Sequence, residues 1–67
     1  MSAKKANELR EMTAEELRVH LRNLRDEHLH LRIKKSLGQI EQFHRFKEIR
    51  REIARTITIL KQKEAEE

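Results

Sequence analysis

The side chains best suited to metal binding or acid–base catalysis in this 67-residue chain are its four histidines. No two of them stand four residues apart, the spacing at which one helix face can hold a metal ion. The HExxH pattern is absent, and so is cysteine, which removes thiolate sites. We therefore expect no metal ion and no other cofactor. The histidines are His20, His28, His30 and His44, with His28 expected in a helix–helix seam and His44 near a turn or on a basic face.

The carboxylates give no better indication of catalysis. Glu15, Glu16, Glu48 and Glu52 have the spacing of exposed helix positions with basic neighbours. A pair of helices offers no cleft in which two carboxylates could acquire different pKa values. Nucleophile elbows and glycine-rich phosphate loops are missing as well. We expect that the protein is not an enzyme and that it has no small-molecule substrate.

Basic side chains, in contrast, form a pattern that suits a polyanion. On a helix, Lys47, Arg51 and Arg55 lie at i, i+4 and i+8 on one face, with the small Ala54 between them. Like charges at this spacing disfavour an isolated helix by roughly 0.2–0.5 kcal/mol per pair, which a polyanion would offset. A solvated face is the simpler alternative. Three further polar side chains lie beside this basic stripe or on its flank: His44, Arg50 and Thr58.

The composition favours long helices and acidic partners. Charged residues make up 42% of the chain, proline is absent and glycine occurs once, so helices are expected and compact β structure is not. Sixteen Lys and Arg against twelve Asp and Glu give a net charge of +4, which favours nucleic acid or another acidic partner. No apolar run is long enough for a signal peptide or a membrane span. We expect a cytoplasmic protein that does not bind a membrane.

A first long helix is predicted over about residues 14–35. Thr13 and Glu16 have the spacing of a capping box, and Met12 and Leu17 have that of a hydrophobic staple. Gly38, the only glycine, favours a left-handed end to this helix. Six positions then repeat at alternating three- and four-residue steps and predict a heptad seam for one partner helix: Ala14, Leu17, Leu21, Leu24, His28 and Leu31.

A second helix is predicted over about residues 40–63, after a turn at about 36–39. Its predicted packing face consists of Phe46, Ile49, Ile53, Ile57 and Leu60. Residues 64–67 are expected to fray, and residues 1–12 to form a short helix or a loose arm. The chain is therefore predicted to be a single all-α domain over 1–67, an antiparallel two-helix hairpin with room for a short N-terminal helical turn. Its single seam is a thin core, so we expect a partner to add stability.

Two kinds of function remain open for such a hairpin. Its basic side chains could contact the phosphates of a structured RNA, whereas two Phe and no Tyr or Trp argue against base stacking on single strands. Alternatively, the seam over residues 17–31 could dimerise in a coiled-coil adapter that binds proteins. The first reading predicts association with RNA, and the second predicts concentration-dependent dimers without RNA.

The order of four segments adds a resemblance to a known family. These segments are ELREMTAEEL, LHLR ending at Arg32, GQIE starting at Gly38, and RFKEIRREIARTITIL. From about Glu8 to Leu60 the chain resembles large-subunit ribosomal protein twenty-nine, and its most specific part is IRREIAR with a threonine three residues on. The resemblance implies an antiparallel helical hairpin that binds large-subunit ribosomal RNA near the nascent-chain exit tunnel. It also implies a location beside large-subunit protein twenty-three, close to where trigger factor and signal recognition particle dock.

The same resemblance implies which residues contact RNA. Three of the matched basic positions, Lys47, Arg51 and Arg55, also belong to the basic stripe. The chain departs from the family pattern at Lys34 and at Gln42 and Phe43, which weakens the expectation of contacts around the turn and leaves the expected fold unchanged. The full set of expected RNA contacts is Arg32, Gln39, Arg45, Lys47, Arg50, Arg51, Arg55 and Thr58.

Overall fold

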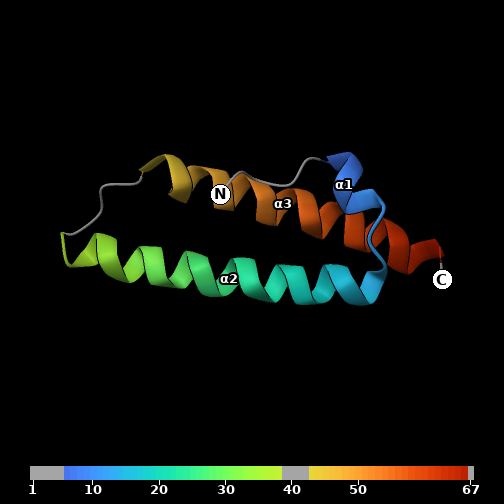
Figure 1. Cartoon of the computed structure of the whole chain (residues 1–67), viewed down its shortest axis with the longest axis horizontal. Helices are drawn as coiled ribbons and strands as arrows, with labels where there is room; N and C mark the ends of the chain where they lie inside the picture. Colours follow the sequence, from blue (N-terminus) through green and yellow to red (C-terminus); the bar gives the residue numbers. More distant parts are fainter. Residues whose placement is uncertain (1–5, 39–42, 67) are drawn as a thin grey trace.

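The computed structural model describes residues 6–38 and 43–66, and it places them in three helices (Figure 1). These helices are α1 (Ala6–Arg10), α2 (Ala14–Ser36) and α3 (Phe43–Glu66). The two long helices lie side by side and run antiparallel, and α1 packs against α3 near its C-terminal end (Figure 1). The prediction of an all-α antiparallel hairpin is confirmed, with α1 as the short N-terminal helix.

The helix bounds agree with the sequence prediction for α2 and differ at the end of α3. Helix α2 spans Ala14–Ser36, against a predicted 14–35. The predicted start of the second helix, near residues 39–40, lies outside the described residues. At the other end α3 continues to Glu66, so the predicted fraying of residues 64–66 is wrong. An ion pair of 3.1 Å between Glu64 and Arg18 joins the last turns of α3 to α2.

The start of α2 is closed by the predicted capping box. The Thr13 amide donates to the Glu16 carboxylate at 2.9 Å, and the Glu16 amide donates to the Thr13 hydroxyl at 3.1 Å. The hydrogen bond from the Thr13 backbone, followed by that of its side chain, lowers the pKa of Glu16. Met12 packs against the core cluster that contains Leu17, as a hydrophobic staple requires. The capping box gives hydrogen-bond partners to two backbone amides at the helix start that would otherwise have none.

The end of α2 follows the predicted glycine stop. The Leu37 amide donates to the Ile33 carbonyl at 3.1 Å, and the Gly38 amide donates to the Lys35 carbonyl at 3.0 Å. Gly38 has a φ of 71°, in the left-handed region that a residue with a Cβ atom rarely adopts. The chain therefore leaves the helix at this glycine because it can turn there without strain.

The predicted seam of α2 is confirmed at five positions that are buried and at His28, which is partly buried. The predicted packing face of α3 is only partly right. Ile49 and Leu60 are buried, but Ile53 and Ile57 are only partly buried, and the prediction missed the buried Ile59. The prediction also missed two polar residues of α3 that are buried, Glu52 and Thr56.

Helix α1 explains part of this difference. Leu9 of α1 is fully buried and belongs to the same cluster as Leu17, Ile59 and Leu60. The core at this end of the hairpin is therefore shared by three helices, and the prediction of a single two-helix seam is wrong. None of the described helices is both long and apolar enough to cross a membrane.

Candidate nucleic-acid interface

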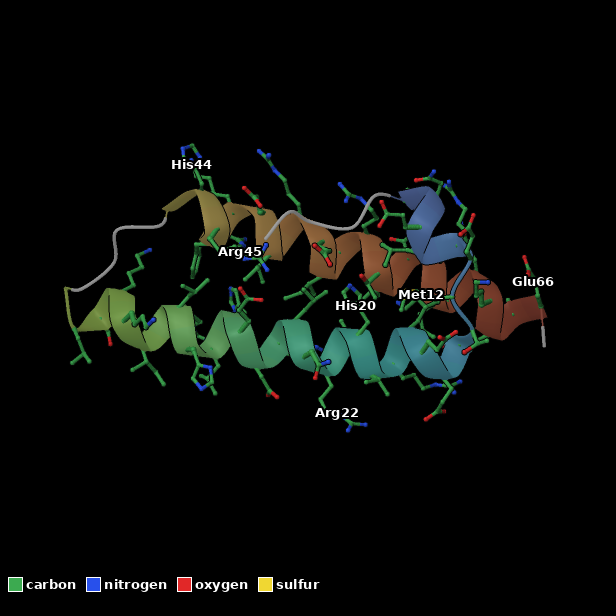
Figure 2. All side chains as sticks on the ribbon, in the orientation of Figure 1. Met12, His20, Arg22, His44, Arg45 and Glu66 are labelled. Carbon is green, nitrogen blue, oxygen red and sulfur yellow. The ribbon has the colours of Figure 1, made fainter. Side chains whose placement is uncertain are left out.

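The basic stripe occupies the side of α3 opposite its buried face. Lys47 and Arg51 are exposed, and Arg55 is partly buried. Figure 2 shows His44, at the start of the same helix, pointing away from α2. Lys47 and Arg51 make no ion pair with an acidic residue anywhere in the described ranges 6–38 and 43–66. These charges are available to a partner.

A small residue opens a hollow within this stripe. The hollow is lined by Lys47, Arg50, Arg51 and Ala54. Ala54 and Thr58 are both exposed, and the Thr58 hydroxyl donates to the Ala54 carbonyl at 3.0 Å. This bond uses the hydroxyl proton and leaves the oxygen as an acceptor. The predicted gap at Ala54 therefore exists, with three cationic side chains around it.

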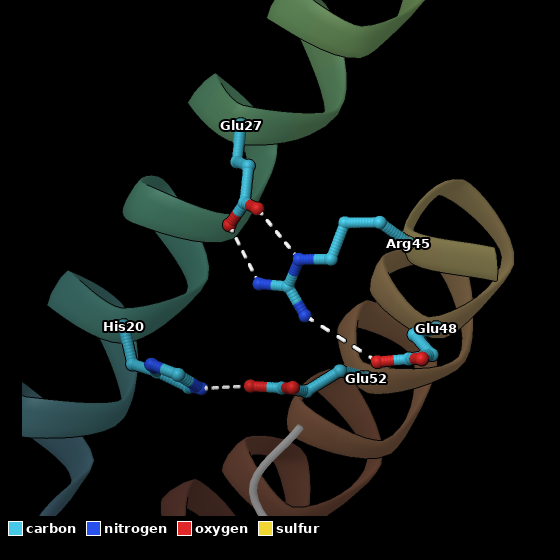
Figure 3. Close-up of polar contacts among 5 residues, drawn as sticks. All are labelled: His20, Glu27, Arg45, Glu48 and Glu52. Carbon is cyan, nitrogen blue, oxygen red and sulfur yellow. Dashed lines mark hydrogen bonds and ion pairs between the residues drawn. The ribbon is translucent and has the colours of Figure 1, made fainter. Parts of the chain in front are cut away.

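Arg45 lies apart from the stripe, between the two long helices. Its Nε and Nη2 atoms donate to the two carboxylate oxygens of Glu27 at 2.7 and 2.8 Å, and its Nη1 lies 3.6 Å from Glu48 (Figure 3). The hydrogen bond with Glu27 raises the pKa of Arg45 above its ordinary value, and its side chain is only 14% exposed. Arg45 therefore joins α3 to α2.

A second polar contact between the helices was not predicted from the sequence. The His20 Nε2 atom lies 2.6 Å from the Glu52 carboxylate, and the two side chains are 16% and 3% exposed (Figure 3). Figure 2 shows His20 pointing from α2 towards α3. The prediction that Glu52 is a surface residue is wrong, because its carboxylate lies between the helices and meets this imidazole. One indication of this contact in the sequence was the position of His20, directly before the buried seam residue Leu21.

The other predicted site residues divide between a flank of the hairpin and a segment that is not described. Arg32 of α2 and Arg50 of α3 are both exposed. Burial lowers the pKa of His28, and the positive charges of Arg32 and Arg50 lower it further. Both arginines are therefore near the same imidazole, although they come from different helices. Gln39 lies outside the described residues.

The ring of His28 packs against a ring of the facing helix. Its centroid lies 4.9 Å from that of Phe46, and the Lys35 ammonium lies 5.2 Å from the Phe46 centroid. Across the described parts of the chain, no group of three His, Cys, Asp or Glu side chains could hold a metal ion. Where the structure defines their contacts, the histidines serve packing, as His28 does, and hydrogen bonding, as His20 does.

The fold and the site together define a class: small, basic helical hairpin proteins with a stripe of cationic side chains on an exposed face of the second long helix. The chain matches the family model for Ribosomal L29 protein over residues 7–63. Because the match covers most of the chain, this protein belongs to the ribosomal L29 family, a structural and non-enzymatic class of ribosomal component.

Proposed function

We propose that this protein binds large-subunit ribosomal RNA through the basic stripe of α3 and so acts as a structural constituent of the large subunit. The observation that carries the proposal is the hollow at Ala54, where Lys47, Arg50 and Arg51 are exposed and make no ion pair with an acidic residue of the described chain. Membership of a ribosomal family supports RNA as the polyanion.

The proposed mechanism is electrostatic docking on the RNA backbone. Lysine and arginine side chains displace counterions from phosphates, so the affinity falls steeply as salt rises. Successive turns of α3 each present one cation, and the gap at Ala54 lets a phosphate approach the helix surface. Such contacts fix the position and orientation of a protein on RNA and carry little sequence information. Thr58 adds a hydroxyl oxygen that can accept from a ribose 2′-OH.

Two residues of the predicted interface have a different or an additional role in this proposal. Arg45 is bound to Glu27, so we assign it to holding the two long helices in register. Arg55 is partly buried, so it contributes mainly to the edge of the stripe. Gln39 and Arg32 remain proposed RNA contacts on the strength of the family resemblance.

The proposed location is the cytoplasmic large subunit, near the mouth of the polypeptide exit tunnel and beside large-subunit protein twenty-three. Trigger factor and signal recognition particle would then dock close by. This location follows from the family resemblance, and the match to the ribosomal family supports it.

The competing reading, a coiled-coil adapter, is not favoured by the packing. The seam over residues 17–31 is occupied by α3 of the same chain, and Leu17, Leu24 and Leu31 are buried there. A dimer through this seam would need the hairpin to open.

The experiment that tests the proposed function is sedimentation of a cell lysate through sucrose gradients at moderate and at high salt. We expect the chain to migrate with the large subunit and with translating ribosomes, and to be released only by strong salt. A chain that stays at the top of the gradient at both salts would refute the proposed function and would favour the adapter.

A further inference from the structure

Three open hollows on the described surface of the hairpin share lining residues with one another. The hollow at Ala54 includes Arg50, which also lines a second hollow with Arg25, His28 and Ile53. Arg25 in turn lines a third hollow on α2 with Arg22 and Asp26 among its residues. The basic surface therefore passes from α3 to α2 at the second hollow. It is formed by both long helices, whereas the basic stripe belongs to α3 alone.

The charges around this second hollow are unbalanced. Arg25, Arg32 and Arg50 are exposed, and none of them forms an ion pair with a carboxylate within residues 6–38 or 43–66. Elsewhere between the helices, basic side chains do have acidic partners: Arg45 pairs with Glu27, and the His20 imidazole contacts the Glu52 carboxylate. Asp26 is the one acid that lines the neighbouring hollow. An arginine cluster that keeps its charge unpaired across two helices suits an external anion.

We propose that Arg25 and Arg50, with Arg32 beside them, form a second phosphate-binding site on the flank of the hairpin, which takes a backbone phosphodiester of RNA. The proposal rests on the proposed function, because it extends the same RNA surface from α3 to α2. Guanidinium groups bind phosphate through paired N–H donors, which gives them both charge and geometry for this ligand. Neither Arg25 nor any neighbouring α2 residue apart from Arg32 was predicted as an RNA contact.

His28 is consistent with this assignment. Its Nε2 atom is buried and has no hydrogen-bond partner among the described residues. Burial and the charges of Arg32 and Arg50 lower the pKa of His28, so the imidazole stays neutral and adds no further positive charge to the cluster. The hollow is therefore lined by two arginine charges together with the neutral imidazole of His28 and the apolar side chain of Ile53.

The geometry also requires the hairpin to be intact. Arg25 and Arg50 come from antiparallel helices, so only the packed seam brings them to the same hollow. An RNA that contacts both arginines would hold α2 and α3 together. Binding of RNA at the flank should consequently stabilise the hairpin. Binding at the stripe alone would contact α3 and not α2.

The test compares four single variants of the full chain for binding to transcribed large-subunit ribosomal RNA over a range of salt concentrations. These variants are Arg25→Gln and Arg25→Lys at the flank, Arg51→Gln on the stripe, and Arg22→Gln as the control. Arg22 is on the same helix one turn earlier; it lines the third hollow but not the second, which is the proposed site, and Figure 2 shows it pointing away from α3. All three positions are exposed, and circular dichroism checks that each variant keeps its helix content.

We expect Arg25→Gln and Arg51→Gln each to weaken binding by roughly tenfold and to lower the salt slope by about one, because each removes one phosphate contact. Arg25→Lys should keep most of the salt slope, which separates loss of charge from damage to the fold. Arg22→Gln should bind like the wild type.

The remaining outcomes each have one meaning. If Arg25→Gln binds like wild type while Arg51→Gln is weakened, the flank site is refuted and the proposed function stands. Equal losses in Arg25→Gln and Arg22→Gln would also refute it, because any charge on α2 would then matter equally. If Arg25→Gln binds RNA normally but fails to enter ribosomes, the flank serves an acidic protein and the phosphodiester proposal fails. If neither Arg51→Gln nor Arg25→Gln changes binding, the proposed function and the flank site both fail.

Discussion

Arg45 of α3 and Glu27 of α2 are joined by two parallel hydrogen bonds of 2.7 and 2.8 Å. The pair crosses the seam between the long helices, and Glu48 adds a second carboxylate group at 3.6 Å from the same guanidinium (Figure 3). A bidentate pair fixes both the distance and the relative orientation of its partners. Arg45 therefore sets how α3 lies on α2, and through that it sets where the basic stripe points.

The first prediction concerns this pair. In a double-mutant cycle with Glu27→Ala and Arg45→Ala, we expect a coupling of about 1 kcal/mol, a modest value because Glu27 remains partly exposed to solvent. The measurement is the free energy of unfolding from urea denaturation followed by circular dichroism. A coupling near zero would show that the two hydrogen bonds contribute nothing to the packing of the helices.

The same variants separate a structural role from an RNA contact. If Arg45 acts only between the helices, Arg45→Ala should leave the salt slope of RNA binding unchanged, because no phosphate contact is lost. A slope reduced by about one would instead make Arg45 an RNA ligand, as the family resemblance implied.

The second prediction compares the exposed face of α3 with its buried face. Arg51→Glu should impair incorporation into the large subunit and leave the helix content nearly unchanged, because Arg51 is exposed. Ile49→Ala should lower the free energy of unfolding by roughly 2–4 kcal/mol, because the Ile49 side chain is fully buried. Gradient sedimentation and circular dichroism measure the two effects. Similar loss of helix in both variants would mean that the faces are not separate.

The third prediction is a dependence of stability on pH that comes from His28. Its pKa is lowered in the folded state from an ordinary value of 6.5, so the unfolded chain takes up a proton more readily than the folded one. The free energy of unfolding should therefore fall as the pH drops below about 6.5, and the fall should level off below the folded-state pKa. In His28→Gln this part of the pH dependence should disappear.

Urea denaturation of both proteins between about pH 7.5 and pH 5 measures the difference, within a range that is above the titration of ordinary carboxylates. Arg50→Gln provides a further check, because removing that positive charge should raise the pKa of His28 observed by NMR. An unchanged His28 titration in Arg50→Gln would contradict the placement of Arg50 beside the imidazole.

The fourth prediction tests the contact between His20 and Glu52. His20→Ala should lower the free energy of unfolding by roughly 1–3 kcal/mol, because a buried carboxylate then loses one hydrogen-bond partner. His30→Ala is the matched control, since His30 is exposed on the same helix. The two variants are compared by thermal or urea unfolding at neutral pH. If both variants are equally stable, the short His20–Glu52 contact adds nothing to the free energy of unfolding.

Local features of the fold could be predicted from the sequence because their causes are local. The Thr13–Glu16 capping box and the Gly38 stop each depend on residues within one helical turn. The α2 seam was also predictable, because apolar side chains occupy five of its six positions. At these places the residue types alone predict the local structure that is observed.

The packing face of α3 was harder to predict because polar residues belong to it. One series of its buried or half-buried positions steps by three or four residues, as a heptad seam does. Four of these seam positions are Arg45, Ile49, Glu52 and Thr56. A prediction that follows apolar residues alone turns the face towards Ile53 and Ile57. The correct face depends on Glu27 and His20 of the other helix, and on α1, none of which can be assigned to α3 by spacing within it.

In the candidate site too, features set within one helix were predictable and features set between helices were not. The exposed positions of Lys47 and Arg51 followed from helix periodicity, and the structure places both beside the hollow at Ala54. The link to Arg25 depends on the register between α2 and α3, which the sequence of either helix does not contain. The predicted contacts therefore lay on α3 and, through Arg32, on α2, but the hollow that the two helices share was not predicted.

The packing of α1 has a consequence for the order in which this chain can fold. Leu9 lies in the same buried cluster as Ile59 and Leu60, which come much later in the chain. A chain is synthesised from its N-terminus, so this part of the core cannot close before α3 has been made as far as these residues. Until then α1 lacks the partners that bury Leu9.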